Sequence, residues 1–390
     1  MIATQLAPLA PAMPEAATVI VRQATPGDAA ARCELFAGVS METDLVLSVR
    51  RDPDFDLLYR LQSADWESWV VEVDGRIEGM GTILVRDGYV GGERRRVGYL
   101  GDLRFSSRAE GRLLIDRLYG PLLDAASARF RCDAFLTTII TSNARAVRAL
   151  TVRNTRSVRS GRPVYTPLMD FDIRSLHLLT IPRCGRASRG IGVRRAGEQD
   201  VPAIARLLDD DGRRRPFGYP MEEIELRRRL ATWPGLSIES FYVAESARGE
   251  LLGTIALWDA TPAKRMIVRE YRRGLRRVRL AYDLAARLLR RPRLPAPGDQ
   301  LRYAYVTHQA VRDDDPRVLQ SLLRSAARER RGSGEHFLSI CAPADGVVDA
   351  ATRGFFATNL AARLFVVTAP GRTSDPSWFS GRPGFEMALV

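Results

Sequence analysis

The pattern of apolar and polar positions repeats along the chain. Residues 21–28 (VRQATPGD) and 193–200 (VRRAGEQD) share the form V-R-x-A-x-x-x-D, offset by 193 − 21 = 172 residues. Each segment predicts a short strand followed by an amphipathic helix. Asp28 and Asp200 are placed to act as helix N-caps. The repeat indicates two copies of one structural unit.

Two further pairs of segments support this repeat. Residues 68–85 and 241–258 each predict a β-hairpin with a tight turn. Apolar strands are expected at 134–141 and 336–342, each after a long helical segment. The expected turns are Asp74-Gly75 and Arg248-Gly249, and the matched residues are Glu72 with Glu245 and Gly79 with Gly253.

The copies predict a domain organisation. Each has the order strand, helix, hairpin, strand, helix, strand, helix, strand, which indicates a mixed α/β sheet. They span residues 18–180 and 193–390, joined by a Gly-, Arg- and Ser-rich linker at 181–192. Residues 1–17 contain prolines and no basic stretch, so they predict a disordered leader rather than a signal peptide. Residues 263–300 are a basic insertion in the second copy, predicted to be helical.

The insertion has two interpretations. An amphipathic helix rich in arginine is compatible with an anionic membrane surface or with nucleic acid. The alternative, which we favour, is a solvated arginine face that covers the second unit. The apolar residues expected near one face are Tyr271, Leu275, Val278, Ala281, Tyr282, Ala285 and Leu289.

Composition limits the class of protein. The chain has 390 residues, 45% hydrophobic and 27% charged, as is ordinary for globular units. A net charge of +13 favours acidic partners. However, Lys264 is the only lysine, and such use of arginine is typical of codon bias. The scattered cysteines form no CxxC pair and no metal-spaced cluster appears, so we expect reduced thiols, a cytoplasmic location and no metal. No apolar run reaches the ~18 residues of a membrane span.

Residues 97–115 (VGYLGDLRFSSRAEGRLLI) join an apolar strand to a helix through a glycine-bearing turn. Asp102 lies on the strand, the turn covers 106–110, and Gly111 precedes the helical pattern. The first amides of a helix are free and lie at the positive end of its dipole. The segment is therefore a candidate phosphate-binding turn, with a purely structural turn as the alternative.

This order of elements, with VGYLGDLRF…EGRLL in its centre, resembles the GNAT superfamily of acyl-CoA-dependent N-acetyltransferases. The resemblance implies an α/β fold of two GNAT-like units, each a mixed, mostly antiparallel twisted sheet flanked by helices. It implies acetyl-CoA or another acyl-CoA as co-substrate. It also implies transfer of the acyl group to an amine of a small molecule or peptide, with no nucleic-acid partner.

The resemblance also implies the residues of the CoA site. The segment TSNARAVRAL (141–150) resembles a family segment whose Asn lies near the cofactor. Counted from Arg108, the loop has Leu113 where a glycine is usual; counted from the strand, Glu110 stands where Arg or Gln is expected. Both registers place backbone amides of 108–113 on the phosphates. The implied residues are Leu103, Arg104, Phe105, Arg108, Ala109, Glu110, Gly111, Arg112, Leu113 and Asn143.

The second copy's loop, 311–323, has no glycine and carries three consecutive aspartates that would repel phosphate. Asp315 followed by Pro316 predicts a helix start, so a structural role is favoured there.

Acyl transfer to an amine needs a base for the ammonium proton and an acid for the thiolate. Asp102 is the candidate base, with a solvent-facing strand residue as the alternative; for Glu72 an ion-pairing role is favoured. The family's acid is a tyrosine, and none occurs at 143–158; Tyr165 is expected in a strand and Tyr119 in the core. The rival function is a non-catalytic tandem module that binds acyl-CoA or a partner. The oligomeric state stays open.

Overall fold

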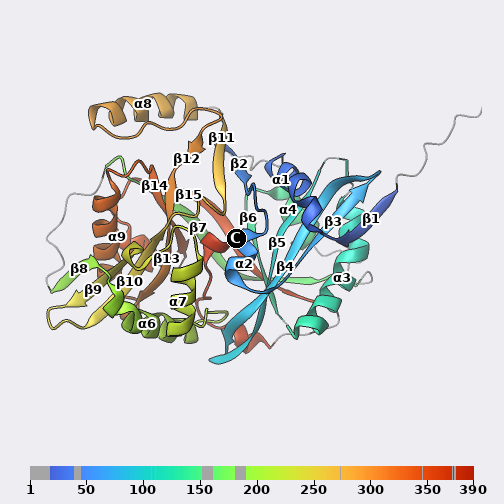
Figure 1. The fold of residues 1–390 in the computed structure, drawn as a ribbon, viewed down its shortest axis with the longest axis horizontal. Coiled ribbons are helices and arrows are strands. Elements are labelled where there is room, and N and C mark those ends of the chain that lie inside the picture. The colour runs from blue at the N-terminus through green and yellow to red at the C-terminus, as the bar shows by residue number, and fades with distance from the viewer. Residues whose placement is uncertain are drawn as a thin grey trace, which may run out of the picture.

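The fold is one continuous twisted sheet with helices on both faces (Figure 1). The computed structural model describes residues 18–38, 45–106, 108–109, 111–132, 134–151, 161–180, 190–272, 274–344, 346–370, 372 and 375–390. In the first half, the strands are β1 (Val19–Gln23), β2 (Leu45–Arg50), β3 (Asp65–Val73), β4 (Arg76–Val90), β5 (Glu93–Phe105), β6 (Phe135–Ile140) and β7 (Val164–His177). The helices there are α1 (Ala29–Gly38), α2 (Leu57–Gln62), α3 (Gly111–Phe130) and α4 (Ala144–Thr151).

The second half repeats this arrangement. Its strands are β8 (Ile191–Arg195), β9 (Phe241–Ser246), β10 (Leu251–Trp258), β11 (Arg265–Tyr271), β12 (Gln300–Leu301), β13 (Tyr303–Val311), β14 (Phe337–Pro343) and β15 (Ala357–Thr368). Its helices are α6 (Val201–Arg213), α7 (Glu223–Thr232), α8 (Leu275–Leu288), α9 (Pro316–Arg330) and α10 (Val347–Ala351). Within the described residues, no helix is both long and apolar enough to cross a bilayer.

The large sheet has twelve strands in the order β1-β3-β4-β5-β6-β15-β7-β14-β13-β10-β9-β8. Its neighbours are antiparallel except for β5 with β6 and β13 with β14, which are parallel. The expected mixed, mostly antiparallel sheet is therefore confirmed. Both predicted hairpins are confirmed as well, since β3 pairs with β4 and β9 with β10.

The two halves exchange their last strands. β7, from the first half, pairs with β14, and β15, from the second half, pairs with β6. β7 and β15 also pair with each other at the centre of the sheet. Each half therefore completes the sheet of the other. The division into 18–180 and 193–390 stays a prediction, and its leader (1–17) and most of its linker (181–189) lie outside the described residues.

The repeated V-R-x-A-x-x-x-D motif holds the start of each half by ion pairs rather than by helix N-caps. Asp28 Oδ2 accepts from the Thr25 amide at 2.6 Å, and Asp200 Oδ2 accepts from the Gly197 amide at 2.8 Å. Both carboxylates therefore reach backward along the chain, and the N-cap prediction was wrong. The repeated arginine holds each one: the pairs are Arg22 with Asp28 and Glu72, and Arg194 with Asp200 and Glu245. The ion-pairing role favoured for Glu72 is confirmed.

The basic insertion was predicted to be helical, but only part of it forms a helix. Its first part, β11, pairs with β2 of the first half, and with β12 they form a second sheet. Strand pairing across the two halves overrides the helical pattern of the sequence. On α8, the buried residues are Tyr282 and Ala286, whereas Val278 and Leu289 of the predicted apolar face are 52% and 41% exposed.

The core is shared by both halves. One hydrophobic cluster includes Leu58 and Leu61 of α2 together with Trp233 and Trp258 of the second half. The Trp233 indole N–H donates to the Leu61 carbonyl oxygen at 3.0 Å, and the Tyr89 hydroxyl donates to Asp209 at 2.8 Å. Buried contacts of this kind fix the two halves against each other.

Candidate functional site

Strands β5 and β6 separate soon after they meet. Their parallel ladder has two residue pairs in the described structure, the second between Tyr99 and Leu136. The Thr137 hydroxyl then donates to the Leu100 carbonyl oxygen at 2.8 Å. Beyond this point β5 remains paired with β4 while β6 diverges. The edge of β5 that faces β6 can therefore offer backbone groups to a ligand.

A β-bulge at Asp102 changes which side chains of β5 face each side of the sheet. The register against β4 shifts between Met80 and Thr82, and Asp102 has φ of 55°. Asp102 and Arg104 consequently face α1 and α2, where Arg104 lies 3.9 Å from the centroid of the Phe36 ring. The second half has a matching bulge at His308, with φ of 47°.

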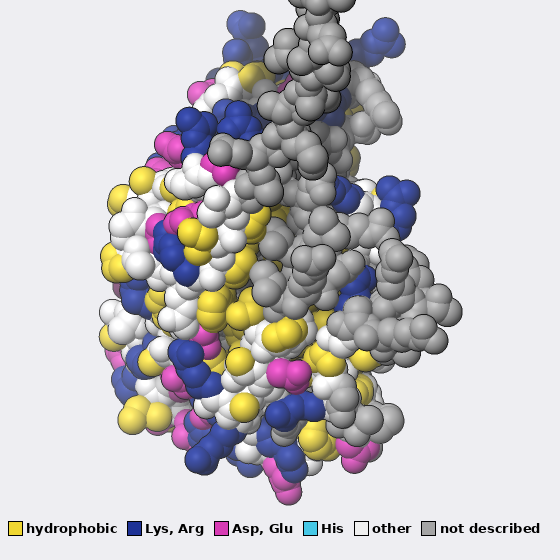
Figure 2. All heavy atoms as spheres, turned by 90° about the vertical axis from the view of Figure 1, so that its right-hand side faces the viewer, with side chains coloured by type: hydrophobic (Ala, Val, Ile, Leu, Met, Phe, Trp, Pro, Cys, Tyr) yellow, Lys and Arg dark blue, Asp and Glu magenta, His cyan; other side chains and the backbone are white. Residues whose placement is uncertain are grey.

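An apolar cavity lies between the sheet and helices α3 and α4. Its empty volume, including its mouth, is about 760 Å³. Strands β1, β3, β4, β5 and β6 all contribute to its wall. Figure 2 views this end of the molecule and shows hydrophobic side chains gathered beside the part drawn in grey, with arginines around them. The lining residues that matter below are Val21, Trp69, Val71, Gly81, Leu103 and Phe105.

Tyr119 of α3 and Tyr165 of β7 also line the cavity. The Tyr165 hydroxyl donates to the Tyr119 hydroxyl at 3.2 Å. Burial raises the pKa of Tyr119 to about 12 and that of Tyr165 well above its ordinary value. Both groups are therefore protonated at neutral pH. Tyr165 lies in a strand, as predicted.

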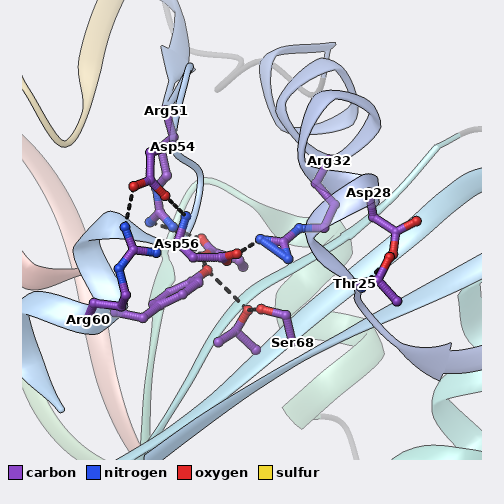
Figure 3. A network of polar contacts seen from close by, with 11 residues as sticks. Thr25, Asp28, Arg32, Arg51, Asp54, Asp56, Arg60 and Ser68 are labelled. Atoms are coloured by element: carbon purple, nitrogen blue, oxygen red, sulfur yellow. Dashed lines mark hydrogen bonds and ion pairs between the residues drawn. The ribbon is translucent and has the colours of Figure 1, made fainter. Parts of the chain in front are cut away.

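On the opposite face of the sheet, Asp102 belongs to a buried polar network, two members of which, Arg51 and Ser68, are labelled in Figure 3. Arg51 Nη1 donates to Asp102 Oδ2 at 2.8 Å, and the Tyr59 hydroxyl donates to the same oxygen. The Thr82 hydroxyl donates to the Tyr59 hydroxyl at 3.0 Å and is also 2.9 Å from the Ser68 hydroxyl. The side chains of Arg51 and Asp102 are 2% and 11% exposed, so this carboxylate does not face solvent.

The network fixes the charge of Asp102. Burial alone would raise the pKa of Asp102, but the positive charge of Arg51 and the hydrogen bond from Tyr59 hold it below its ordinary value. The carboxylate also keeps the pKa of Arg51 above its ordinary value, although burial opposes this. The pair is therefore ionised across the physiological pH range.

Two titratable side chains of the second half lie close to this network. Lys264 donates to the Val390 backbone oxygen at 2.6 Å, and its Nζ lies 4.8 Å from the centroid of the Tyr305 ring. Burial and the charge of Arg51 lower the pKa of Lys264 to about 7. Glu386 accepts from the His308 amide at 3.3 Å, and burial raises the pKa of Glu386 to about 7.

The sequence analysis did not assign either group to the site. For Lys264 one signal was present: it is the only lysine of an arginine-rich chain. Its place next to the network depends on β11, which begins at the next residue and pairs with β2. For Glu386 the sequence carried no comparable signal. Within the described ranges, no group of three or more His, Cys, Asp or Glu side chains could hold a metal ion.

The structure places the residues implied for CoA binding in different positions. Leu103 and Phe105 line the cavity, whereas Arg104 is on the opposite face of the sheet. The backbone amides of Arg108 and Ala109 donate to the Ser106 hydroxyl at 3.1 and 3.4 Å.

The remaining implied residues belong to the starts of α3 and α4. Gly111, Arg112 and Leu113 form the first turn of α3, and Glu110 lies outside the described residues. Asn143 Oδ1 accepts from the Ala146 amide at 3.0 Å and so caps α4.

The corresponding region of the second half is closed by its own side chains. Asp315 caps α9, accepting from the Arg317 amide at 2.8 Å, which confirms the predicted helix start. A Cβ at Gly253 would lie 2.8 Å from Val318 of α9. The residues of α9 that face the sheet are fully buried: Leu319, Leu322, Leu323, Ala326 and Ala327.

Residues 40–151, which contain α2, the β3–β4 hairpin, β5, α3, β6 and α4, match the model of the acetyltransferase (GNAT) family. The match assigns this segment of the first half to the GNAT family. The matched segment includes the bulge at Asp102 and the point where β5 and β6 separate. No curated protein sequence matches this chain significantly.

Solved structures with a similar fold cover nearly the whole chain. N-myristoyltransferase of Saccharomyces cerevisiae with bound myristoyl-CoA has a TM-score of 0.57 and 11% identity, covering 96% of this chain and 90% of that one. A GCN5-related N-acetyltransferase of Sphaerobacter thermophilus has a TM-score of 0.54 and 15% identity, covering 92% and 98%. A tandem GNAT protein of the clavulanic acid pathway has a TM-score of 0.51 and 11% identity, covering 92% and 100%. The fold is one that supports acyl-CoA-dependent acyl transfer.

Proposed function

We propose that this protein transfers an acyl group from acyl-CoA to an amine of a small molecule or peptide, at a site in its first half. The observation that carries the proposal is the separation of β5 from β6 directly beside an apolar cavity. A shared fold with a protein whose structure holds bound myristoyl-CoA supports acyl-CoA as the co-substrate class. The implied amine acceptor and a cytoplasmic location belong to the same proposal.

Residues of the first half fit such a co-substrate. The separated edge of β5 can pair with amide groups of the pantetheine arm, and the amides in the first turn of α3 can face its phosphates. Gly111 allows a close approach there because it has no side chain. When bound, acyl-CoA supplies a thioester that is activated for attack by an amine.

The amine would meet the buried network on the other side of β5. Gly101 lines the cavity, and the next residue, Asp102, holds the network with Arg51. The network therefore begins one residue along β5 from the cavity wall. In this proposal, Asp102 attracts and orients an ammonium group by its negative charge.

Proton removal is a separate task. A carboxylate with a lowered pKa is a weak proton acceptor, and efficient bases have pKa values near the working pH. Lys264 and Glu386, whose pKa values are both about 7, meet this requirement better than Asp102 does. We therefore propose that Asp102 positions the amine and that Lys264 or Glu386 takes its proton.

A thiol-release assay with acyl-CoA and a panel of amines tests this function. We expect amine-dependent release of CoA thiol by the wild type and at least a tenfold loss in Gly111→Trp, whose side chain would cover the first turn of α3. Asp315→Ala, the matched control in the second half, should retain the wild-type rate. Absence of thiol release by the wild type with every amine would refute catalysis.

The rival is a non-catalytic module that binds acyl-CoA. It is favoured by the loop geometry, because the Arg108 and Ala109 amides are already bonded to Ser106 and the Asn143 side chain already caps α4. Binding of acyl-CoA without thiol release would support this rival.

A further inference from the structure

We propose that the apolar cavity binds the hydrocarbon chain of a medium- or long-chain acyl-CoA, so that the transferred group is a fatty acyl group. The inference rests on the proposed function and specifies its substrate class. Its evidence is the length of the cavity, the chemistry of its wall and a glycine that keeps it open.

The length of the cavity exceeds what an acetyl group needs. The cavity wall includes a row of residues on neighbouring strands: Val21 of β1, Val71 of β3, Gly81 of β4 and Leu103 of β5. Strands lie about 4.8 Å apart, so this row spans about 14 Å. A fully extended peptide spans ~3.5 Å per residue, and each residue has three backbone bonds. An extended hydrocarbon chain therefore advances about 1.2 Å per bond. A hydrocarbon chain of about twelve bonds would therefore reach across the cavity from β5 to β1.

The four hydroxyl groups in the wall take part in hydrogen bonds, whereas the Trp69 indole N–H has no partner among the described residues. The Thr137 hydroxyl donates to the Leu100 carbonyl oxygen, and the Thr82 hydroxyl donates to Tyr59 on the opposite face. The Tyr119 and Tyr165 hydroxyls are bonded to each other. Because the hydroxyl groups have partners, the wall presents mainly carbon atoms to a ligand, with the Trp69 N–H as an unpaired donor.

Gly81 keeps the cavity open. It pairs with Trp69 across β3 and β4 and shares the α3 face with Ile83, two residues further on. In the second half the matching residue, two after Gly253, is Ile255, which is fully buried in the core against α9. One half therefore fills this position with a side chain and the other half leaves it empty.

The test is calorimetric titration with free CoA, acetyl-CoA, octanoyl-CoA and dodecanoyl-CoA. We expect affinity to rise with chain length as far as dodecanoyl, by up to roughly fourfold per buried methylene. If no CoA compound binds, the proposed function itself fails. If acetyl-CoA and dodecanoyl-CoA bind equally well, the CoA site stands and the chain-length inference is overturned.

A cavity-filling variant locates the chain. A Cβ at Gly81 would lie 3.4 Å from Leu103 Cδ1, an ordinary contact, so the backbone accepts a side chain there. Gly81→Leu should reduce the preference for dodecanoyl-CoA over acetyl-CoA by at least tenfold. Gly332→Leu, which adds the same side chain on an exposed turn with open space around it, should keep the wild-type preference. An unchanged preference in Gly81→Leu would overturn the assignment of this cavity.

A separate observation concerns α8, which lies apart from the main sheet (Figure 1). Leu280, Leu284 and Leu288 form one stripe, and their exposed fractions are 71%, 62% and 76%. Helical residues four apart share a face, so the three side chains form a continuous apolar strip. We infer that α8 docks the protein on an anionic lipid surface.

The charge around the strip favours an anionic lipid surface over a nucleic acid or a second copy of the chain. Exposed arginines lie beside the strip and at its ends, and the side chain of one of them, Arg276, is 74% exposed. Leucines inserted among lipid chains with arginines at the headgroups are typical of interfacial helices. A nucleic acid has no use for the leucine strip, and a second copy of α8 would bring arginine against arginine. The other exposed arginines are Arg277 and Arg287 of α8 and Arg290, just after the end of the helix.

Sedimentation with phosphatidylcholine vesicles, with and without phosphatidylglycerol, tests this docking. We expect binding that needs phosphatidylglycerol and weakens with salt, because salt screens the arginines. The Leu284→Gln/Leu288→Gln double variant should lose at least tenfold in binding. Ile224→Gln, which changes an equally exposed side chain on α7, should bind as the wild type does.

Three results would overturn the lipid assignment. In the first, the wild type fails to bind phosphatidylglycerol vesicles; in the second, the leucine double variant binds them as well as the wild type does. The third result is a wild-type protein that is dimeric in solution and a leucine double variant that is monomeric. The last result would assign the strip to contact between two copies of the chain.

Discussion

Replacement of Asp102 by Asn should destabilise the protein strongly. The substitution keeps the shape of the side chain but leaves the Arg51 charge unpaired, and that side chain is only 2% exposed. Breaking a buried ion pair from one side costs about 3–5 kcal/mol. Because Asn can still accept the Tyr59 hydrogen bond, we expect about 3 kcal/mol in free energy of unfolding. The unfolding entropy is ~2.1 cal/mol/K per residue, or about 0.8 kcal/mol/K for the whole chain. A loss of about 3 kcal/mol therefore lowers the melting temperature by about 4 °C.

Chemical denaturation of three variants beside the wild type measures this effect. Asp170→Asn breaks an exposed pair with Arg363, whose side chains are 58% and 42% exposed, and should cost under about 1 kcal/mol. The double variant Arg51→Met/Asp102→Leu removes both buried charges and should recover most of the loss. If Asp102→Asn costs no more than Asp170→Asn, the buried pair is not formed and the account of Asp102 is wrong.

The same pair predicts a pH dependence. The pKa of Asp102 is lower in the folded protein than in the unfolded chain, where it is about 3.9. Its contribution to stability is therefore complete above the unfolded value and is lost as pH falls through the folded value. The stability difference between wild type and Asp102→Asn should accordingly shrink below about pH 4.

Four further variants test other parts of the structure. Lys264→Met should lower the rate of acyl transfer by about 10²-fold and remove an ionisation near pH 7 from the pH–rate profile, whereas a structural role would leave that ionisation in place. Burial raises the pKa of Glu386 to about 7 in the folded protein, above about 4.3 in the unfolded chain. Wild-type stability should therefore fall as pH rises from about 4.3 to 7, and Glu386→Gln should abolish this fall in thermal melts. Gly98→Ala would place Cβ 2.0 Å from the Phe135 ring and should cost about 1–3 kcal/mol in denaturant titrations; an unchanged midpoint would contradict the close β5–β6 contact. Asp315→Ala should cost about 1 kcal/mol by loss of the α9 cap and leave acyl-CoA affinity unchanged by calorimetry.

Local patterns were enough to predict the repeated units. The hairpin turns at Asp74-Gly75 and Arg248-Gly249, and the cap at Asp315, depend on residues that are close in sequence. The exchange of β7 and β15 depends instead on which of several apolar strands pair at the centre of the sheet. No local residue specifies that choice.

The site was predicted only in part, for a related reason. Asp102 was identifiable from its strand, but its partner Arg51 lies 51 residues away and comes from another element. The sequence therefore gave Asp102 a catalytic role without the ion pair that lowers its pKa. The role of Gly81 can be recognised only from its place in the sheet opposite Trp69, where an absent side chain leaves space in the cavity. The helical pattern at 263–300 hid β11, which brings Lys264 beside the network.

The number of acyl-CoA molecules bound per chain tests the central claim most directly. Calorimetry or native mass spectrometry would measure it for the wild type, Gly111→Trp and Asp315→Ala. The account predicts one molecule per chain, lost in Gly111→Trp and retained in Asp315→Ala. No binding by the wild type, or one molecule held equally well by Gly111→Trp, would contradict a site formed by the first half.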